Sequence, residues 1–142
     1  MSLKKIACCL GLAAACVAQV ALAESSSSVV YENQRGSTLV LVLHPELGDA
    51  GTLTGSFTTK VGNCAKDMNQ ALPIKGYYNG NALSVTVNYP HCKQLSAMTG
   101  NLSDDQNTIH MLWLHANQAK DANGKDWNTN IIGSDVYTKL GD

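Results

Sequence analysis

The sequence predicts an all-β protein, an eight-stranded antiparallel up-and-down β-barrel. Apolar and polar residues alternate through residues 52–61 and 82–89, which is the period of a half-buried strand. The pair Asn79-Gly80 lies between two strand-like runs and is a strong signal for a tight hairpin. No helical period of any length follows the serine run at residues 25–28. A barrel of this size has room inside for side chains or for one small ligand.

The expected strands follow one another with short connections. A polar Asn-x-x-Gly-Ser turn separates the first strand from the second, which is apolar on both faces. The third and fifth alternate strictly, and the hairpin joins the fourth to the fifth. The sixth precedes a second two-faced apolar strand, the seventh, and the eighth carries an aspartate on its apolar face. The eight expected ranges are 29–34, 37–44, 52–61, 74–79, 82–89, 94–102, 108–116 and 130–139.

The first 23 residues have the pattern of an export signal. Two lysines precede an apolar run, and a small-residue cleavage sequence ends at Ala23. We therefore expect a signal peptide over residues 1–23, a flexible leader over 24–30 and one barrel domain over 31–140. The protein is then secreted or periplasmic. Lipid attachment at Cys16 is an alternative, although the three alanines before it fit a lipoprotein signal poorly.

The composition of the mature chain excludes some partners. Without its two signal-peptide lysines the chain has eight basic and eleven acidic residues, a net charge of about −3, so no basic stripe exists for nucleic acid. We expect no membrane partner either, because the outward faces of residues 54–60 and 84–88 carry Thr, Ser, Lys and Asn, which cannot face lipid.

Two cysteines, Cys64 and Cys92, remain after export into an oxidising compartment. We expect them to form a disulfide. The alternative is a metal site made of both cysteines and His91, but it lacks a fourth ligand and any paired Cys-x-x-Cys spacing.

Polar residues lie on faces that should point into the barrel. Asp135 shares a face with Tyr137, and Thr59 and Val61 share one with Phe57. Ser37 shares the face of Leu39 and Leu41, and Asn33 lies just before the turn.

Beside Trp113 these groups indicate a pocket with a few convergent polar groups in an apolar wall. Alternatively, each is a turn cap or a satisfied strand-end hydroxyl.

These residues lie in motifs that resemble the avidin and streptavidin family. The segments "NQRGSTL", "GTLTGSFTTKVGN", "VTVNY", "SAMTGNL", "IHMLWL" and "IIGSDVYTK" have that family's order and spacing over the whole mature chain. The resemblance implies biotin as the bound ligand, with no other cofactor and no metal.

The resemblance also implies roles at the ureido group of biotin. Asn33 and Ser37 would donate to the ureido oxygen, and Asp135 and Thr59 would accept its two N–H protons. The family's third donor to the oxygen is a tyrosine hydroxyl, but Phe57 stands in its place.

Other matched positions surround the rest of the ligand. Asn63 corresponds to the backbone that meets the biotin carboxylate, and Gln94 and Ser96 to side chains around the sulfur and the tail. Trp113 matches one wall of the aromatic box. Trp127 matches the tryptophan that a neighbouring subunit places over the pocket.

Four further departures from the family pattern make the box smaller and wetter. Tyr89 and Met98 replace aromatic residues, Arg35 replaces an apolar one, and His115 replaces leucine. We interpret His115 as a rim histidine bonded to water. The expected ligand-binding residues are Asn33, Ser37, Phe57, Thr59, Val61, Asn63, Tyr89, Gln94, Ser96, Met98, Trp113, Trp127 and Asp135.

The second apolar face predicts a homo-oligomer, at least a dimer and by preference a tetramer. Leu112 and Leu114 lie on that face, which a lone barrel would leave wet. By resemblance, Trp127 belongs to tetrameric members, whereas Cys64 and Cys92 match the disulfide of short dimeric ones. Scattered surface aliphatics are the alternative.

The predicted function is a non-catalytic protein that sequesters biotin more weakly than streptavidin does. The chain has no Gly-x-Ser-x-Gly elbow, phosphate loop or cysteine nucleophile, so we expect no enzyme. Two alternatives stay open: an avidin-like module that has lost biotin binding, and a barrel enzyme that uses Asp135 as a base.

Overall fold

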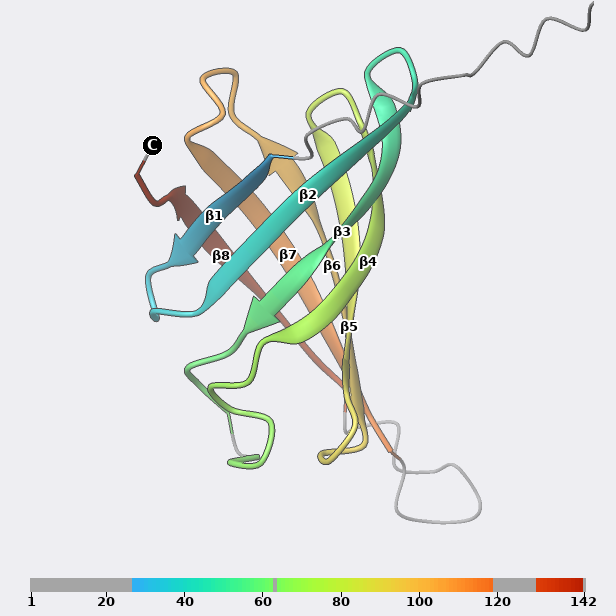
Figure 1. Ribbon diagram of the computed structural model, residues 1–142. Coiled ribbons are helices and arrows are strands. Elements are labelled where there is room, and N and C mark those ends of the chain that lie inside the picture. Colours follow the sequence, from blue (N-terminus) through green and yellow to red (C-terminus); the bar gives the residue numbers. More distant parts are fainter. Residues whose placement is uncertain (1–26, 63, 119–129, 142) are drawn as a thin grey trace, which may run out of the picture.

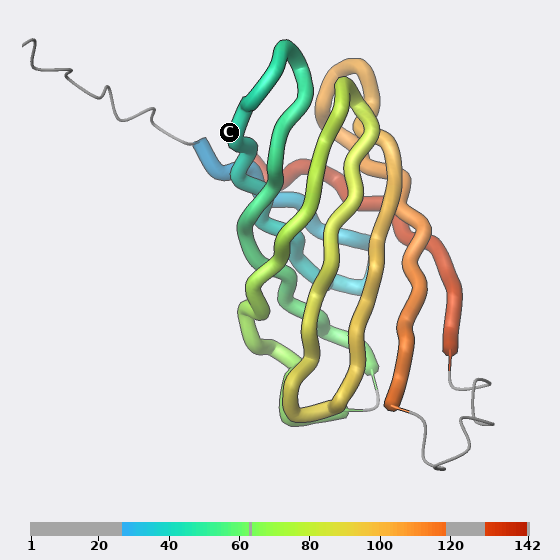
Figure 2. Tube along the Cα trace, turned by 90° about the vertical axis from the view of Figure 1, so that its right-hand side faces the viewer, coloured from blue at the N-terminus to red at the C-terminus, as the bar shows by residue number. Residues whose placement is uncertain are grey.

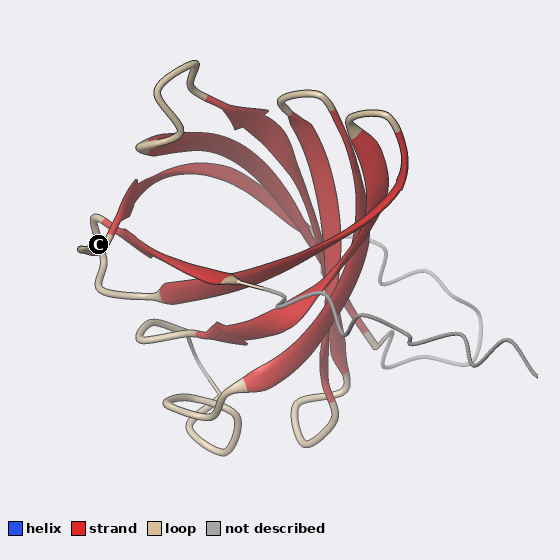
Figure 3. Ribbon diagram, turned by 45° about the horizontal axis from the view of Figure 1, so that its top comes forward, coloured by secondary structure: helices blue, strands red, loops and turns tan. Residues whose placement is uncertain are grey.

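The computed structural model describes residues 27–62, 64–118 and 130–141, and within them eight antiparallel strands form one closed barrel (Figures 1 and 3). Each strand pairs with its neighbours in chain order, and β1 pairs with β8 to close the sheet. The strands are β1 (Ser28–Asn33), β2 (Thr38–Leu47), β3 (Ala50–Thr58), β4 (Leu72–Asn79), β5 (Ala82–Tyr89), β6 (Gln94–Leu102), β7 (Thr108–Asn117) and β8 (Ile131–Lys139). The predicted fold class is confirmed.

β5 and β6 have the predicted boundaries, and the other six strands differ from the predicted ranges by one to three residues at one or both ends. β1 begins at Ser28, inside the range expected for the leader, and β4 begins at Leu72 instead of residue 74. β2 runs on to Leu47 through an irregularity next to Pro45, which has no N–H to donate to the ladder. β3 ends at Thr58 rather than at residue 61.

The hairpin between β4 and β5 lies between the predicted strand ends, but its two turn residues are not the Asn79-Gly80 pair. Asn79 still pairs with Ala82, so the two-residue turn consists of Gly80 and Asn81. Gly80 has φ of +56°, the left-handed region that glycine adopts without strain. Glycine at the first central position of such a turn matches the right-handed twist of the strands.

The alternating pattern produces the core of the barrel. Along β5, Leu83, Val85, Val87 and Tyr89 are buried while the residues between them are exposed. The buried apolar side chains of all eight strands form one cluster inside the barrel. In the described part of the chain, no helix is long and apolar enough to span a membrane.

One end of the barrel carries the β1–β2 turn, the β3–β4 connection and the β5–β6 turn (Figures 1 and 2). The disulfide Cys64–Cys92 joins the β3–β4 connection to the β5–β6 turn, as predicted, with 5.9 Å between the two Cα atoms. Because each sulfur is bonded to the other, the alternative metal site has no thiolates. The buried Asp67 carboxylate strengthens this junction by accepting the backbone N–H groups of His91 and Cys92 at 3.1 and 3.0 Å.

The outer surface of β6, β7 and β8 is apolar and exposed. Leu112 and Ile132 are 65% and 78% exposed, and the same surface continues over Leu95, Leu114 and Val136. The predicted second apolar face therefore exists in the folded chain, on adjacent strands.

Candidate functional site

A cavity of about 270 Å³ opens at the disulfide end of the barrel. Its volume suits one small ligand. Two expected site residues, Asn63 and Trp127, lie outside the described residues. The other eleven all line the cavity: Asn33, Ser37, Phe57, Thr59, Val61, Tyr89, Gln94, Ser96, Met98, Trp113 and Asp135.

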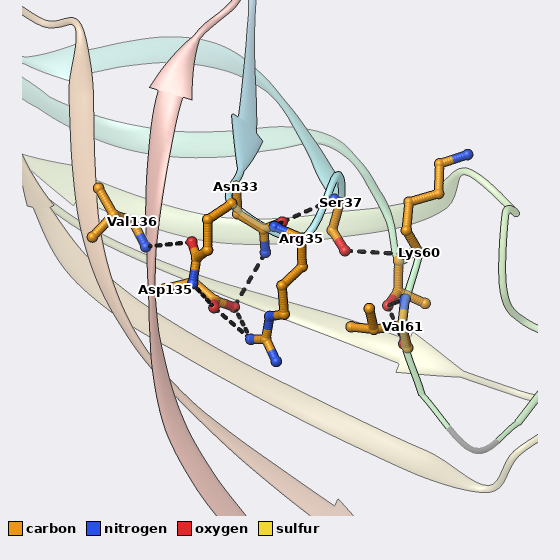
Figure 4. A network of polar contacts seen from close by, with 9 residues as sticks. Asn33, Arg35, Ser37, Lys60, Val61, Asp135 and Val136 are labelled. Atoms are coloured by element: carbon orange, nitrogen blue, oxygen red, sulfur yellow. Dashed lines mark hydrogen bonds and ion pairs between the residues drawn. The ribbon is translucent and has the colours of Figure 1, made fainter.

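The Asn-x-x-Gly-Ser turn between β1 and β2 points an amide and a hydroxyl into this cavity (Figure 4). Asn33 Oδ1 accepts the backbone N–H groups of Arg35 and Ser37 at 3.0 and 2.8 Å, so the side-chain Nδ2 is left to donate elsewhere. Gly36 has φ of +77°, which the turn needs and which glycine permits. The Ser37 oxygen accepts the Lys60 N–H at 3.0 Å, so its own proton is available for donation.

Asp135 is a buried charge of the cavity, with only 5% of its side chain exposed. As the sequence predicts for a buried carboxylate, it is surrounded by donors. Asn33 Nδ2 donates to Oδ2 at 3.2 Å, Gln34 Nε2 donates to Oδ1 at 2.9 Å, and Arg35 Nη2 contacts both oxygens, Oδ2 at 2.5 Å (Figure 4). Gln34 also accepts the N–H of Val136, which ties the β1–β2 turn to β8.

Arg35 is a functional candidate that the sequence marks only as a departure from the family. Its guanidinium pairs with Asp135 and lies with Cζ 5.7 Å from the centre of the Trp113 ring. That distance is within the range of a cation–π contact. The side chain is 38% exposed, so it reaches the carboxylate from the open end of the cavity.

His115 belongs to the cavity wall, where its ring contacts protein side chains. Its ring lies 4.9 Å from Trp113 and 6.0 Å from Tyr89, centre to centre, and its Nδ1 hydrogen-bonds with the Ser96 hydroxyl. Burial lowers the pKa of His115, and the nearby Arg35 charge lowers it further. The alternation of β7 does place His115 on the face of Trp113, but the cross-strand partner Ser96 appears only when β6 and β7 pair.

Trp113 packs against β8 because Gly133 has no side chain. A Cβ atom at Gly133 would lie 2.2 Å from Trp113 Cζ2, closer than any real contact. The indole Nε1 is buried and has no hydrogen-bond partner among the described residues.

Phe57 and Tyr137 face the cavity from different strands. Phe57 contributes an apolar ring from β3, as expected from the sequence. Tyr137 on β8 has no predicted site role, but it is fully buried and its hydroxyl lies beside Asn33 in the cavity lining. Burial and the neighbouring Asp135 charge both raise the pKa of the Tyr137 hydroxyl, which keeps it protonated. The cavity therefore has a phenolic hydroxyl beside Asn33 that is not at position 57.

Thr59 explains why β3 ends earlier than predicted. Its hydroxyl donates to the Val61 carbonyl at 2.6 Å and accepts the Val61 N–H at 3.3 Å, so the chain turns there instead of continuing the strand. Because the proton is committed to Val61, Thr59 can only accept a hydrogen bond from a molecule in the cavity.

A closed eight-stranded barrel with an aromatic wall and a few polar groups at one end of its cavity is a small-ligand-binding protein. The carboxylate of Asp135 accepts hydrogen bonds from Asn33, Gln34 and Arg35.

Comparison with known proteins identifies the family. The model of the avidin family matches residues 22–140, so the chain belongs to the avidin family, as the resemblance of its motifs indicates. Bradavidin shares 26% sequence identity with a TM-score of 0.66, over 82% of this chain and 82% of bradavidin.

Two structures with lower identity match in fold alone. A rhizavidin–biotin complex has 21% identity and a TM-score of 0.64, over 82% of this chain and 95% of rhizavidin. Apo shwanavidin has 23% identity and a TM-score of 0.62, over 84% and 99%.

The lowered pKa of His115 predicts a pH dependence of stability. The unfolded chain binds a proton at His115 more readily than the folded chain, so the stability contributed by neutral His115 is present above about pH 6.5 and is lost as the pH falls toward the folded pKa. Denaturant unfolding at several pH values should show a shallower acid loss for His115→Gln than for the unmodified protein. His110→Gln, on the exposed face of β7, is the control and should keep the original slope. Equal slopes for all three proteins would contradict the burial of a neutral imidazole.

Proposed function

We propose that this protein binds biotin in the barrel cavity and does not change it chemically. The observation that carries the proposal is the meeting of donors and acceptors at one end of the cavity. Asn33 and Ser37 direct N–H and O–H groups into it, and Asp135 lies within hydrogen-bonding distance of Asn33. The complex of the related rhizavidin with biotin supports the same ligand here.

A ureido group fits this set of groups. Its oxygen would accept from Asn33 Nδ2 and the Ser37 hydroxyl, and its two N–H groups would donate to Asp135 and Thr59. Thr59 can only accept, which is the property this role requires.

The fused rings of biotin would lie along the apolar part of the cavity, between Trp113, Met98 and Phe57. Gln94 at the start of β6 is half-buried near the mouth, where the ligand tail would leave. Asn63 and Trp127 stay predictions for the tail and for a lid from a neighbouring subunit.

We further propose that affinity for biotin is lower than that of streptavidin. Phe57 has no hydroxyl to donate, and Tyr89 and Met98 offer less aromatic contact than the tryptophan or phenylalanine of the family pattern. The N-terminal signal pattern supports action outside the cytoplasm, with cleavage after Ala23.

Biotin should stabilise the folded protein by mass action. At a ligand concentration a thousandfold above the dissociation constant, the free energy of unfolding rises by about 4 kcal/mol. Thermal unfolding of the mature protein with and without excess biotin measures the gain as a rise in Tm, and a biotin methyl ester tests whether the tail carboxylate matters. An unchanged Tm at millimolar biotin would favour a barrel that has lost its ligand.

Phe57→Tyr should tighten biotin binding. The change adds one hydroxyl to a ring that already lines the cavity, and a hydrogen bond to the polarised ureido oxygen is worth about 1 to 3 kcal/mol, or about ten- to a hundredfold in affinity. Competition against labelled biotin should show most of the gain in a slower off-rate. Tyr137→Phe is the control for the hydroxyl beside Asn33. If the Tyr137 hydroxyl orients the Asn33 amide toward the ureido oxygen, its removal should weaken biotin binding. A dissociation constant that Phe57→Tyr leaves unchanged or raises would show that position 57 does not face the ureido oxygen.

We also propose that the apolar surface of β6, β7 and β8 is covered by a second copy of the chain. Leu112 and Ile132 are among its most exposed side chains, and a patch of large aliphatic residues on adjacent strands is unusual for a monomer. Leu112→Lys should lower the molar mass measured by light scattering at micromolar concentration, because it places a charge in the contact. Thr86→Lys, on the polar outer face of β5, should leave the mass unchanged. A monomeric mass for the unmodified protein would contradict the proposal.

A further inference from the structure

We propose that Arg35 is a specificity-determining residue whose guanidinium occupies the place of a ureido group in the ligand-free cavity. A ureido ligand must then displace Arg35 from Asp135 before it can pair with that carboxylate. The inference rests on the proposed function and adds to it a competitor within the chain.

The hydrogen bonds of Asp135 leave no position for a ligand while Arg35 is in place. A carboxylate accepts about four hydrogen bonds with its two oxygens. In the structure, Oδ1 accepts from Gln34 and Arg35, and Oδ2 accepts from Asn33 and Arg35. The amide of Asn33, which would donate to the ureido oxygen, is itself turned toward Asp135. Both groups become available only if Arg35 leaves and Asn33 is released.

The Arg35 side chain resembles a ureido ligand in shape and in hydrogen bonding. A guanidinium is a planar group with N–H donors arranged around one carbon, as the two N–H groups of urea are. It also lies over Trp113, the wall on which the rings of a ligand would pack. The cavity therefore already accommodates a planar N–H donor at Asp135, supplied by the protein.

Arg35 can leave without unfolding the turn that carries it. The backbone of the turn is held by Asn33 Oδ1 and by Gly36, neither of which depends on the guanidinium. The side chain is 38% exposed and enters from the mouth, so its rotation into water is open. The fraction of molecules in which Arg35 has left sets the apparent affinity for a ureido ligand.

Nuclear magnetic resonance can follow Arg35 directly, because it is the single arginine in the sequence. The arginine side-chain signals of a nitrogen–proton correlation spectrum therefore come from one residue. Because Arg35 Nη2 contacts Asp135, we expect the Nη–Hη signal to be protected from exchange with water in the ligand-free protein and to take on the fast exchange of a free arginine when biotin is added. A signal that is solvent-like before biotin, or unchanged by saturating biotin, would overturn the proposal.

Calorimetry with biotin tests the energetic consequence. Arg35→Ala should lower the Tm of the ligand-free protein, because Asp135 loses a charged partner, yet it should tighten biotin binding by about ten- to a hundredfold, the range expected for one charge-assisted hydrogen bond. A merely structural role would lower the Tm and leave the dissociation constant unchanged or raised, which would overturn the proposal. Lys75→Ala, which removes an exposed cation from the outer face of β4, is the control and should change neither quantity.

A rescue experiment gives a readout without biotin. Millimolar methylguanidinium should raise the Tm of Arg35→Ala and not that of the unmodified protein, because it can refill the vacated position beside Asp135. If it has no effect on the variant, the cavity does not hold a planar guanidinium at that position and the proposal fails.

The outcomes separate this inference from the proposed function. Biotin binding by the unmodified protein that Arg35→Ala does not improve would overturn the inference and keep the function. Binding by Arg35→Ala alone would support the inference and show that the natural chain excludes biotin. Binding by neither protein would overturn both.

Discussion

The buried carboxylate of Asp135 is the constraint on which the rest of the site depends. Such a charge needs donors, and three of them come from one turn that lies 100 to 102 residues earlier in the chain. That turn reaches Asp135 because β1 pairs with β8. Closing the barrel and assembling the polar end of the cavity are therefore the same event, which links the stability of the fold to the chemistry of the site.

The two ends of the cavity are organised by different forces. Near Asp135, charge-assisted hydrogen bonds orient Asn33 and Arg35 in a partly dry environment. At the mouth, the Cys64–Cys92 disulfide and the buried Asp67 hold the β3–β4 connection against the β5–β6 turn. The mouth of the cavity is therefore already formed, whereas the hydrogen-bonding groups at its inner end are paired with other protein groups. The affinity for a ligand depends on the protein hydrogen bonds that it must displace as much as on the contacts that it makes.

Local sequence patterns predicted most of the fold, and their failures have local causes. Alternation at period two is a property of a single strand, so β5 and the inward face of β7 follow from it. β3 ends early because the Thr59 hydroxyl hydrogen-bonds to the Val61 backbone, and this bond competes with continuation of the strand. The alternation of polar and apolar residues does not reveal such a bond. Gly80 takes the first central position of the hairpin turn rather than the second, because a glycine can occupy either position of a two-residue turn.

By itself, the sequence determined the barrel class, the inward faces, the family and the pairing of Cys64 with Cys92, because each of these depends on residue type and spacing. Only the tertiary structure decided how the polar side chains are used. In the sequence, Arg35 is only a substitution in a predicted turn. Its ion pair with Asp135 forms because β1 pairs with β8. His115 reads as a rim residue until β6 brings Ser96 beside it. The register of the strands and the closure of the barrel decide which side chains meet across it. Both are relations between segments far apart in the chain, so the sequence of either segment alone does not determine them.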